Sequence, residues 1–156
     1  MNRFLGTRSL TGLVLLALLL LPSCSKRFNR ENPIPGNTLV IEFAQKIKYV
    51  MSLEIDGKEV PIRYSGGSKV LYVKGLAPGT HNVNIHSISY VFGPEFMAFE
   101  VDENKGHYLY IQSRKYRSAV PKNRSQVSIR AYRRKLKEEG IDVKDPEPGQ
   151  VYAYFD

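Results

Sequence analysis

Residues 53–60, LEIDGKEV, decide the fold class of this chain. The dipeptide Asp56-Gly57 stands between two runs in which apolar and polar residues alternate. Asp-Gly in that setting is the strongest short-range hairpin signal, because a type I′ turn needs a positive φ at both central residues. The stretch therefore predicts two antiparallel strands joined by a two-residue turn. The apolar positions of the expected strands are Leu53 and Ile55 before the turn and Val60, Ile62 and Tyr64 after it.

The same alternation extends on both sides of this hairpin, over residues 38–116. A period of two is typical of half-buried strands, and turn signals such as Pro78-Gly79 and 102–106, DENKG, separate the runs. We expect residues 107–111 to pair back on the run before that last turn. About seven short strands without a long helical period predict a mainly β fold, a small antiparallel β-sandwich.

Within the run that follows Pro78-Gly79, the alternation changes parity without an intervening turn signal. Its apolar positions are odd at Val83 and Ile85 but even at Ile88 and Tyr90. A slip of one residue moves every following side chain to the other face of a strand, so it predicts a bulge or bend near His86.

The hairpin stretch 53–60, together with 76–83, LAPGTHNV, resembles the PEGA-type small β-sandwich module and the similar transthyretin-like modules. These families share a strand, an Asp-Gly-Lys hairpin and a following strand that opens with Pro-Gly. The resemblance covers roughly residues 38–116. It implies a sandwich fold and an extracytoplasmic binding or scaffolding role without catalysis.

The first residues of the chain are typical of a secretory signal peptide. Residues 1–8 carry two arginines and no acid, and residues 10–21 are almost wholly apolar. That run is shorter than the roughly 20 residues that a membrane-spanning helix needs. A basic start followed by a short apolar run and small residues predicts export.

The apolar run ends in Leu21-Pro22-Ser23-Cys24, which resembles the lipobox of bacterial lipoproteins. The resemblance implies removal of residues 1–23, a diacylglyceryl thioether on Cys24 and an N-terminal acyl chain such as palmitate. Two or three acyl chains together give stable membrane attachment, whereas one chain binds reversibly. Ser25, in place of Asp, favours the outer membrane, with the protein facing the periplasm. An uncleaved anchor is the alternative.

The remaining chain is long enough for one domain. Removing residues 1–23 removes two arginines and no acid, so 133 residues remain and the net charge falls from +8 to +6. Cys24 is the only cysteine, so packing alone must stabilise the fold. Residues 24–37 contain two prolines and little periodicity, and we interpret them as the lipidated cysteine with a flexible tether.

Residues 117–156 are expected to form a basic and then acidic extension that packs on the sandwich. Residues 128–139 place apolar side chains on one helical face, and Gly140 then stands where a helix commonly ends. A strand over 126–129 is equally compatible with the pattern, and so is a strand that runs into a short helix. The alternation in 151–155 predicts a final strand.

Residues 104–137 hold eleven basic residues and no acid. Such a block is a candidate surface for phosphate or carboxylate groups, and tyrosines lie among the charges. For an exported chain we expect anionic lipid, lipopolysaccharide or peptidoglycan as partners before nucleic acid. The alternative is a solvated basic face balanced by the acidic residues that follow. The candidate anion-binding residues are Arg114, Lys115, Arg117, Arg130, Arg133, Arg134 and Lys137.

No motif of a catalytic or metal site stands out. His81, His86 and His107 lack the spacing of metal ligands, and the chain contains neither Gly-x-Ser-x-Gly nor a phosphate-cradling loop. We therefore expect no metal, no cofactor and no enzymatic activity. The expected function is a membrane-anchored envelope lipoprotein that binds or scaffolds another envelope component. The alternatives are a module for anionic glycan or lipid phosphate and, least favoured, an envelope hydrolase.

Overall fold

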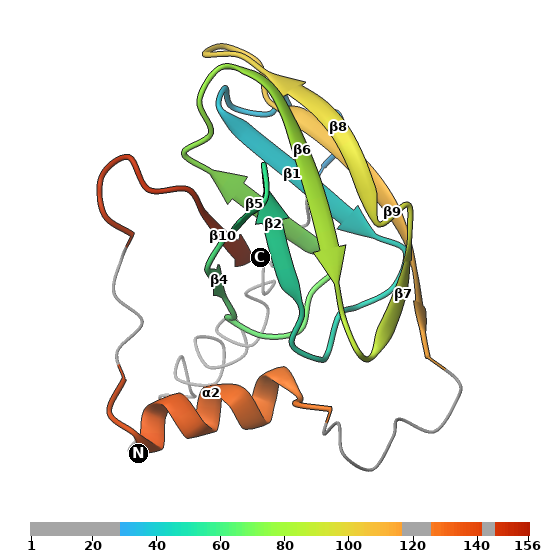
Figure 1. The fold of residues 1–156 in the computed structure, drawn as a ribbon, viewed down its shortest axis with the longest axis vertical. Coiled ribbons are helices and arrows are strands. Elements are labelled where there is room, and N and C mark those ends of the chain that lie inside the picture. Colours follow the sequence, from blue (N-terminus) through green and yellow to red (C-terminus); the bar gives the residue numbers. More distant parts are fainter. Residues whose placement is uncertain (1–28, 117–125, 142–145) are drawn as a thin grey trace, which may run out of the picture.

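The computed structural model describes residues 29–116, 126–141 and 146–156 as a two-layer β structure with one helix (Figure 1). The expected signal peptide, Cys24 and Arg117 lie outside these residues. The described elements are β1 (Thr38–Phe43), β2 (Ser52–Ile55), β3 (Lys58–Glu59), β4 (Ile62–Arg63), β5 (Val70–Lys74), β6 (Gly79–His86), β7 (Tyr90–Gly93), β8 (Phe96–Val101), β9 (His107–Lys115), α2 (Ile129–Glu138) and β10 (Tyr152–Phe155).

The strands form two sheets that pack face to face, which confirms the predicted sandwich (Figure 1). One sheet has six strands in the order β4-β10-β5-β1-β9-β7, and the other has four in the order β3-β2-β6-β8. The pairing differs from the expectation in two ways. Ten strands are described, several of them very short, and the pairs β1–β9 and β10–β4 are parallel.

The core lies between the inner faces of the two sheets. Ile41, Phe43 and Ile111 enter it from the six-stranded sheet, and Leu53 and Ile85 enter it from the four-stranded sheet, all fully buried. Burial of each such side chain contributes roughly 1.5–3 kcal/mol relative to exposure. Because the chain forms no disulfide, this packing holds the layers together.

The predicted hairpin is present between β2 and β3. Asp56 and Gly57 both have positive φ, 52° and 73°, as a type I′ turn requires. The Asp56 carboxylate accepts a hydrogen bond from the Asn82 backbone N–H at 2.8 Å and lies 2.7 Å from His81 Nδ1. The turn is therefore fixed both by its backbone and by its contact with β6.

The strand expected after this hairpin is interrupted at Pro61. β3 ends at Glu59, and β4 pairs with β10 in the other sheet instead of continuing along β2. Proline has no N–H to donate to a ladder. The Pro61 carbonyl, where the chain passes to the other sheet, accepts a hydrogen bond from the Ala153 N–H of β10 at 3.0 Å.

The change of parity near His86 marks a change of sheet. β6 ends at His86 in the four-stranded sheet, and β7 begins at Tyr90 in the six-stranded sheet. The alternation predicts that Ile88 points inward, but Ile88 lies in the segment between β6 and β7 and is exposed. The expected bend is therefore present, but it is not a bulge within one strand.

The turn at 102–106 also connects the two sheets. The Asp102 carboxylate accepts hydrogen bonds from the Asn104 and Lys105 N–H groups, at 2.7 and 2.6 Å. The strands on either side then separate, because β8 pairs with β6 whereas β9 pairs with β1 and β7. The expectation that 107–111 pair back on the preceding strand is wrong.

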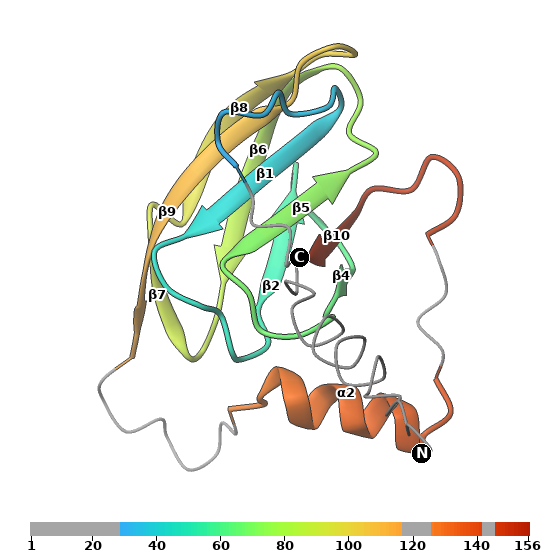
Figure 2. The same ribbon diagram turned by 180° about the vertical axis from the view of Figure 1, so that it is seen from behind.

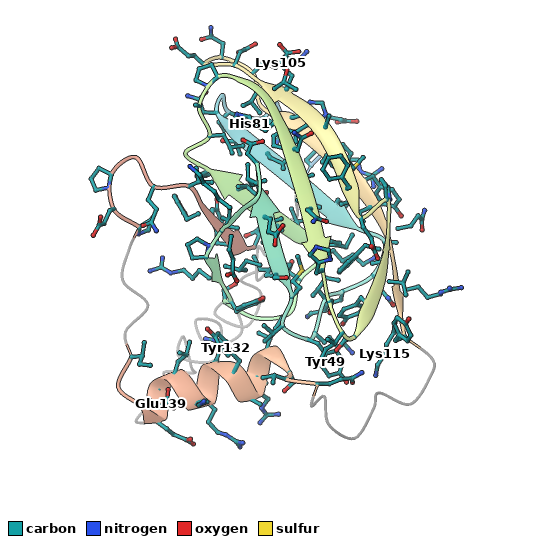
Figure 3. All side chains as sticks on the ribbon, in the orientation of Figure 1. Tyr49, His81, Lys105, Lys115, Tyr132 and Glu139 are labelled. Atoms are coloured by element: carbon teal, nitrogen blue, oxygen red, sulfur yellow. The ribbon has the colours of Figure 1, made fainter. Side chains whose placement is uncertain are left out.

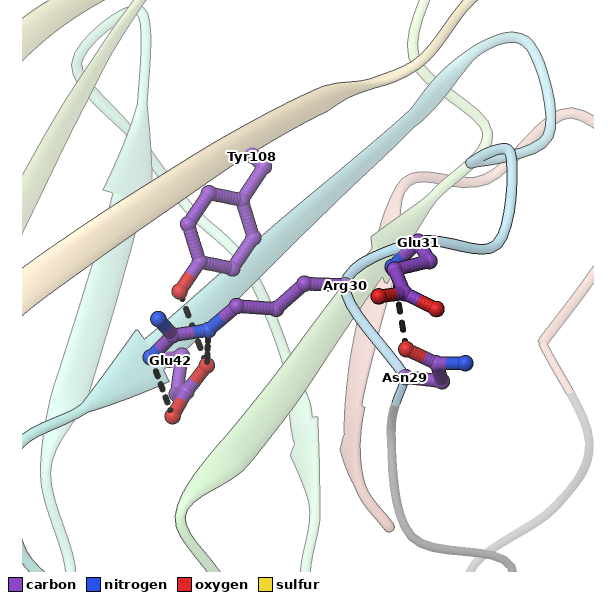
Figure 4. A network of polar contacts seen from close by, with 5 residues as sticks. All are labelled: Asn29, Arg30, Glu31, Glu42 and Tyr108. Carbon is purple, nitrogen blue, oxygen red and sulfur yellow. Dashed lines mark hydrogen bonds and ion pairs between the residues drawn. The ribbon is translucent and has the colours of Figure 1, made fainter.

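Residues 29–37, the described part of the expected tether, are held against the sandwich (Figure 4). Arg30 makes two hydrogen bonds of 2.9 Å to the Glu42 carboxylate, which also accepts one of 2.8 Å from the Tyr108 hydroxyl. Further along, the Gly106 N–H donates to the Ile34 carbonyl at 3.2 Å. The chain is thus fixed to the fold from Arg30 onward, whereas a flexible tether was expected through residue 37.

The C-terminal residues join the same fold. β10 pairs with β5 and β4, and α2 lies across one end of the sandwich in both views (Figures 1 and 2). Of the alternatives for 126–139, the helix is formed, and within these residues only an isolated bridge between Tyr49 and Ser128 precedes it.

Candidate functional site

A groove of about 960 Å³ runs between α2 and the end of the sandwich at β2–β4. Val60 and Tyr64 line it from the sandwich side, and Tyr132 and Leu136 line it from the helix. Volumes of roughly 300–1,000 Å³ are typical of sites for small molecules. We treat this hollow as the first lobe of the candidate site.

Local interactions position the helix that forms one wall. The Ser128 hydroxyl accepts a hydrogen bond from the Ala131 N–H at 3.1 Å and so caps the first turn. Ile129 is buried, and its N–H donates to the Lys48 carbonyl at 2.9 Å. At the other end Gly140, with φ 65°, closes the helix as the sequence predicts.

Tyr64 makes the floor of the first lobe rigid. Its hydroxyl accepts a hydrogen bond from the Met51 N–H at 3.0 Å and donates one to the Met51 carbonyl at 2.8 Å. Its ring stacks on Phe155 and meets Tyr132 edge-on, with centroids 5.6 and 5.8 Å apart. Burial raises the pKa of Tyr64 to about 12, so its hydroxyl stays protonated and has a structural role.

Cations stand on both sides of the first lobe. Arg133 and Lys137 line it from α2, and Arg63 lines it from β4. The Arg133 guanidinium donates a hydrogen bond to the Ser65 carbonyl at 2.6 Å, which ties the helix to the sandwich. An apolar floor with cationic sides is suited to a ligand that has an apolar part and an anionic group.

A second lobe of about 590 Å³ continues past Met51 and Tyr132 toward the β6–β7 crossing. Glu59 lines both lobes, whereas Glu95 and His86 line the second lobe, which has no Lys or Arg in its lining. The electrostatic character therefore changes along the groove. Anionic groups are favoured in the first lobe and disfavoured in the second.

The structure divides the predicted anion-binding residues into separate groups. Arg130, Arg133, Arg134 and Lys137 lie within about one third of the helical circumference, as their spacing in a 3.6-residue period requires. Arg133 and Lys137 line the groove, whereas Arg130 and Arg134 adjoin them on the exposed side of the helix. Arg134 lies 3.7 Å from Glu138 one turn later, in an exposed pair.

The two described candidates on β9 do not join that helical cluster. Lys115 reaches Tyr49, with its Nζ 3.2 Å from the hydroxyl and 5.0 Å from the ring centroid. Arg114 lies in register with Val91 at the edge of the six-stranded sheet. Figure 3 shows Lys115 and Tyr49 beside the end of the sandwich where Tyr132 lies.

Sequence reasoning missed the sandwich side of the groove. Ile62 and Tyr64 were assigned to a continuous strand, and Arg63 was not singled out. The signal was Pro61, which interrupts the expected strand and sends β4 to the other sheet, beside α2.

In the described part of the chain, no three His, Cys, Asp or Glu side chains lie together as metal ligands. Over the same residues, no helix is long and apolar enough to cross a membrane. Comparisons with protein-family models, with curated proteins and with solved structures gave no match. The candidate site therefore rests on the geometry of this chain alone.

Proposed function

We propose that this chain is a membrane-anchored lipoprotein of the bacterial cell envelope, with a sandwich that acts as a non-enzymatic binding or scaffolding module. The observation that carries the anchor is the position of Cys24, the only cysteine, at the end of the apolar run. The PEGA-type resemblance of 53–60 and 76–83 supports the binding or scaffolding role.

Metabolic labelling tests the anchor. Cells that express the full chain are fed a fatty acid carrying a radioactive or alkyne label, and the protein is then purified. The wild type should take up label, and Cys24→Ala should remain as unlabelled precursor or appear as a soluble product. A wild-type protein without label contradicts the proposal.

The groove supports a binding role, and its first lobe favours anionic ligands. This is the observation behind the second candidate, a module for anionic glycan or lipid phosphate. Each surface cation near an anionic surface contributes about 1 kcal/mol, so three must be changed together. The detergent-solubilised lipoprotein is bound to lipopolysaccharide beads at increasing salt. The variant changes Arg130, Arg134 and Lys137 to Gln.

The matched control removes the same charge elsewhere, by changing the exposed residues Lys58, Lys69 and Lys105 to Gln. The helix variant should lose affinity on the order of 100-fold at low salt and show a flatter salt dependence. Equal binding by the wild type and the helix variant would mean that these residues form only a solvated basic face and bind no anionic ligand.

A further inference from the structure

The outer face of the six-stranded sheet carries half of the chain's ten tyrosines. The sheet register places Tyr154, Tyr72, Val40 and Tyr108 in one row across β10, β5, β1 and β9. Val40 is fully buried although it points away from the core, because tyrosines flank it in the row on both sides. The tyrosine face is defined by Tyr72, Tyr108, Tyr110, Tyr152 and Tyr154.

The rings on this face are ordered by their neighbours. Tyr72 and Tyr154 stack with centroids 5.2 Å apart at 11°, and Tyr152 stacks on Tyr154 at 6.1 Å. Lys74 Nζ lies 5.4 Å from the Tyr154 centroid. Tyr110 remains 43% exposed. The face is thus a broad amphipathic surface of rings and hydroxyl groups.

Cations outnumber acids on this face. Arg63 lies in register with Tyr154, and Lys74 lies in register with Tyr152. One acid on this face is Asp156, whose N–H donates to the Val70 carbonyl at 3.2 Å and whose charge adds to burial in raising the pKa of Tyr72. Another acid is Glu42, opposite Tyr110, and its two oxygens accept hydrogen bonds from Arg30. These hydrogen bonds lower the pKa of Glu42. The face therefore complements an anionic surface.

The segment that leads toward Cys24 lies on this same face. Arg30 crosses it beside Tyr108 (Figure 4), and its guanidinium carbon lies 5.6 Å from the centroid of Tyr108 and 5.5 Å from the centroid of Tyr110. Five residues lie between Cys24 and Arg30. Whatever their conformation, the six Cα-to-Cα steps from Cys24 to Arg30 span at most roughly 20 Å.

We propose that the tyrosine face lies against the phospholipid headgroups of the membrane that holds the Cys24 anchor. This inference rests on the proposed lipid attachment. A lipid within roughly 20 Å of Arg30 keeps the side of the sandwich that carries Arg30 near the bilayer. Tyrosine is enriched at membrane–water interfaces because its ring is apolar and its hydroxyl is polar. The cations add attraction to anionic headgroups.

Spin-label depth measurements test this orientation. The complete lipoprotein, with its lipid, is reconstituted in vesicles of phosphatidylcholine and phosphatidylglycerol. Labels are placed at three exposed positions, because Cys24 is the only native cysteine. Gln112→Cys reports on the tyrosine-face side of β9, Ala98→Cys on the outer face of the other sheet, and Glu139→Cys on the far end of α2. The readout is the accessibility of each label to oxygen and to a water-soluble nickel complex.

The label at Gln112 should be several-fold less accessible to nickel than the labels at Ala98 and Glu139. In the Arg30→Ala background the difference should shrink, because the link between the tether and Glu42 is lost. Glu31→Ala is the matched control, since Glu31 is the adjacent exposed residue, and it should leave the difference intact.

The failures of the two proposals are distinguishable by flotation. Protein that separates from the vesicles under alkaline wash overturns both the anchor and the orientation. Protein that floats with the vesicles but shows equal accessibility at the three positions overturns the orientation alone. A label at Ala98 or Glu139 that lies deeper than the label at Gln112 does the same, and it places the other sheet or α2 on the membrane.

Discussion

The sharpest test of the fold concerns Gly57, because its backbone effect can be separated from packing. Its φ of 73° lies in the left-handed region that β-branched residues avoid. A Cβ at this position would meet nothing within 4 Å, so Gly57→Val creates no clash. Any loss of stability must therefore come from the strained backbone.

The magnitude follows from two opposing effects. A β-branched residue in the left-handed region costs about 1–3 kcal/mol. Replacing glycine also restricts the unfolded chain, which returns about 0.4–1 kcal/mol. We expect a net loss of about 1–2 kcal/mol, which lowers the melting temperature of a domain of this size by roughly 3–10 °C.

Two variants serve as controls in thermal and urea unfolding followed by circular dichroism. Gly66→Val adds the same side chain in open space without a positive φ, and it should change stability by no more than about 0.5 kcal/mol. Gly57→Asn should stay close to the wild type, because asparagine tolerates the left-handed region. If Gly57→Val and Gly66→Val unfold at the same midpoint, the type I′ turn is the wrong explanation.

Three further predictions test the contacts around the hairpin and the groove. Ser128→Ala removes the helix cap and should cost about 1 kcal/mol, seen as faster hydrogen exchange in α2. Tyr64→Phe leaves the N–H and carbonyl of Met51 without their buried partner and should lower the free energy of unfolding by about 1–3 kcal/mol. Both ring nitrogens of His81 lie 2.7 Å from oxygen atoms, one of Asp56 and one of the Ala77 carbonyl. Burial lowers the pKa of His81, but these two hydrogen bonds outweigh burial, so the pKa is raised. The hydrogen bond with His81 also lowers the pKa of Asp56. The stability difference between wild type and His81→Gln should therefore be largest at pH 5–6 and shrink as the pH rises through the folded-state pKa of His81.

The sequence predicted the parts of the fold that depend on neighbouring residues. The turn at Asp56-Gly57 requires positive φ at two adjacent positions, and Asp followed by Gly is a pair that tolerates it. The helix end at Gly140 is local in the same way. The alternation over 38–116 predicted the mainly β class, because a period of two fits half-buried strands.

The sequence did not predict which strands share a sheet, and the reason is geometric. The inner faces of both layers point into one core, so a strand shows the same alternation in either sheet. β8 and β9 illustrate this, since a tight turn joins them although they belong to different layers. The sequence indicates that the chain passes from one sheet to the other only where the alternation is irregular, as at Pro61 after β3 or at the change of parity after Ile85.

The basic residues show how the same limit applies to a site. Eleven cations follow one another in 104–137, but charge in sequence becomes a surface only when the period of the element is known. On α2 a period of 3.6 gathers Arg130, Arg133, Arg134 and Lys137 on one side. On β9 a period of two leaves Arg114 and Lys115 on opposite faces, so that Lys115 meets Tyr49. The helical four can therefore act together, and a charge-removing variant confined to β9 should leave binding at the groove unchanged.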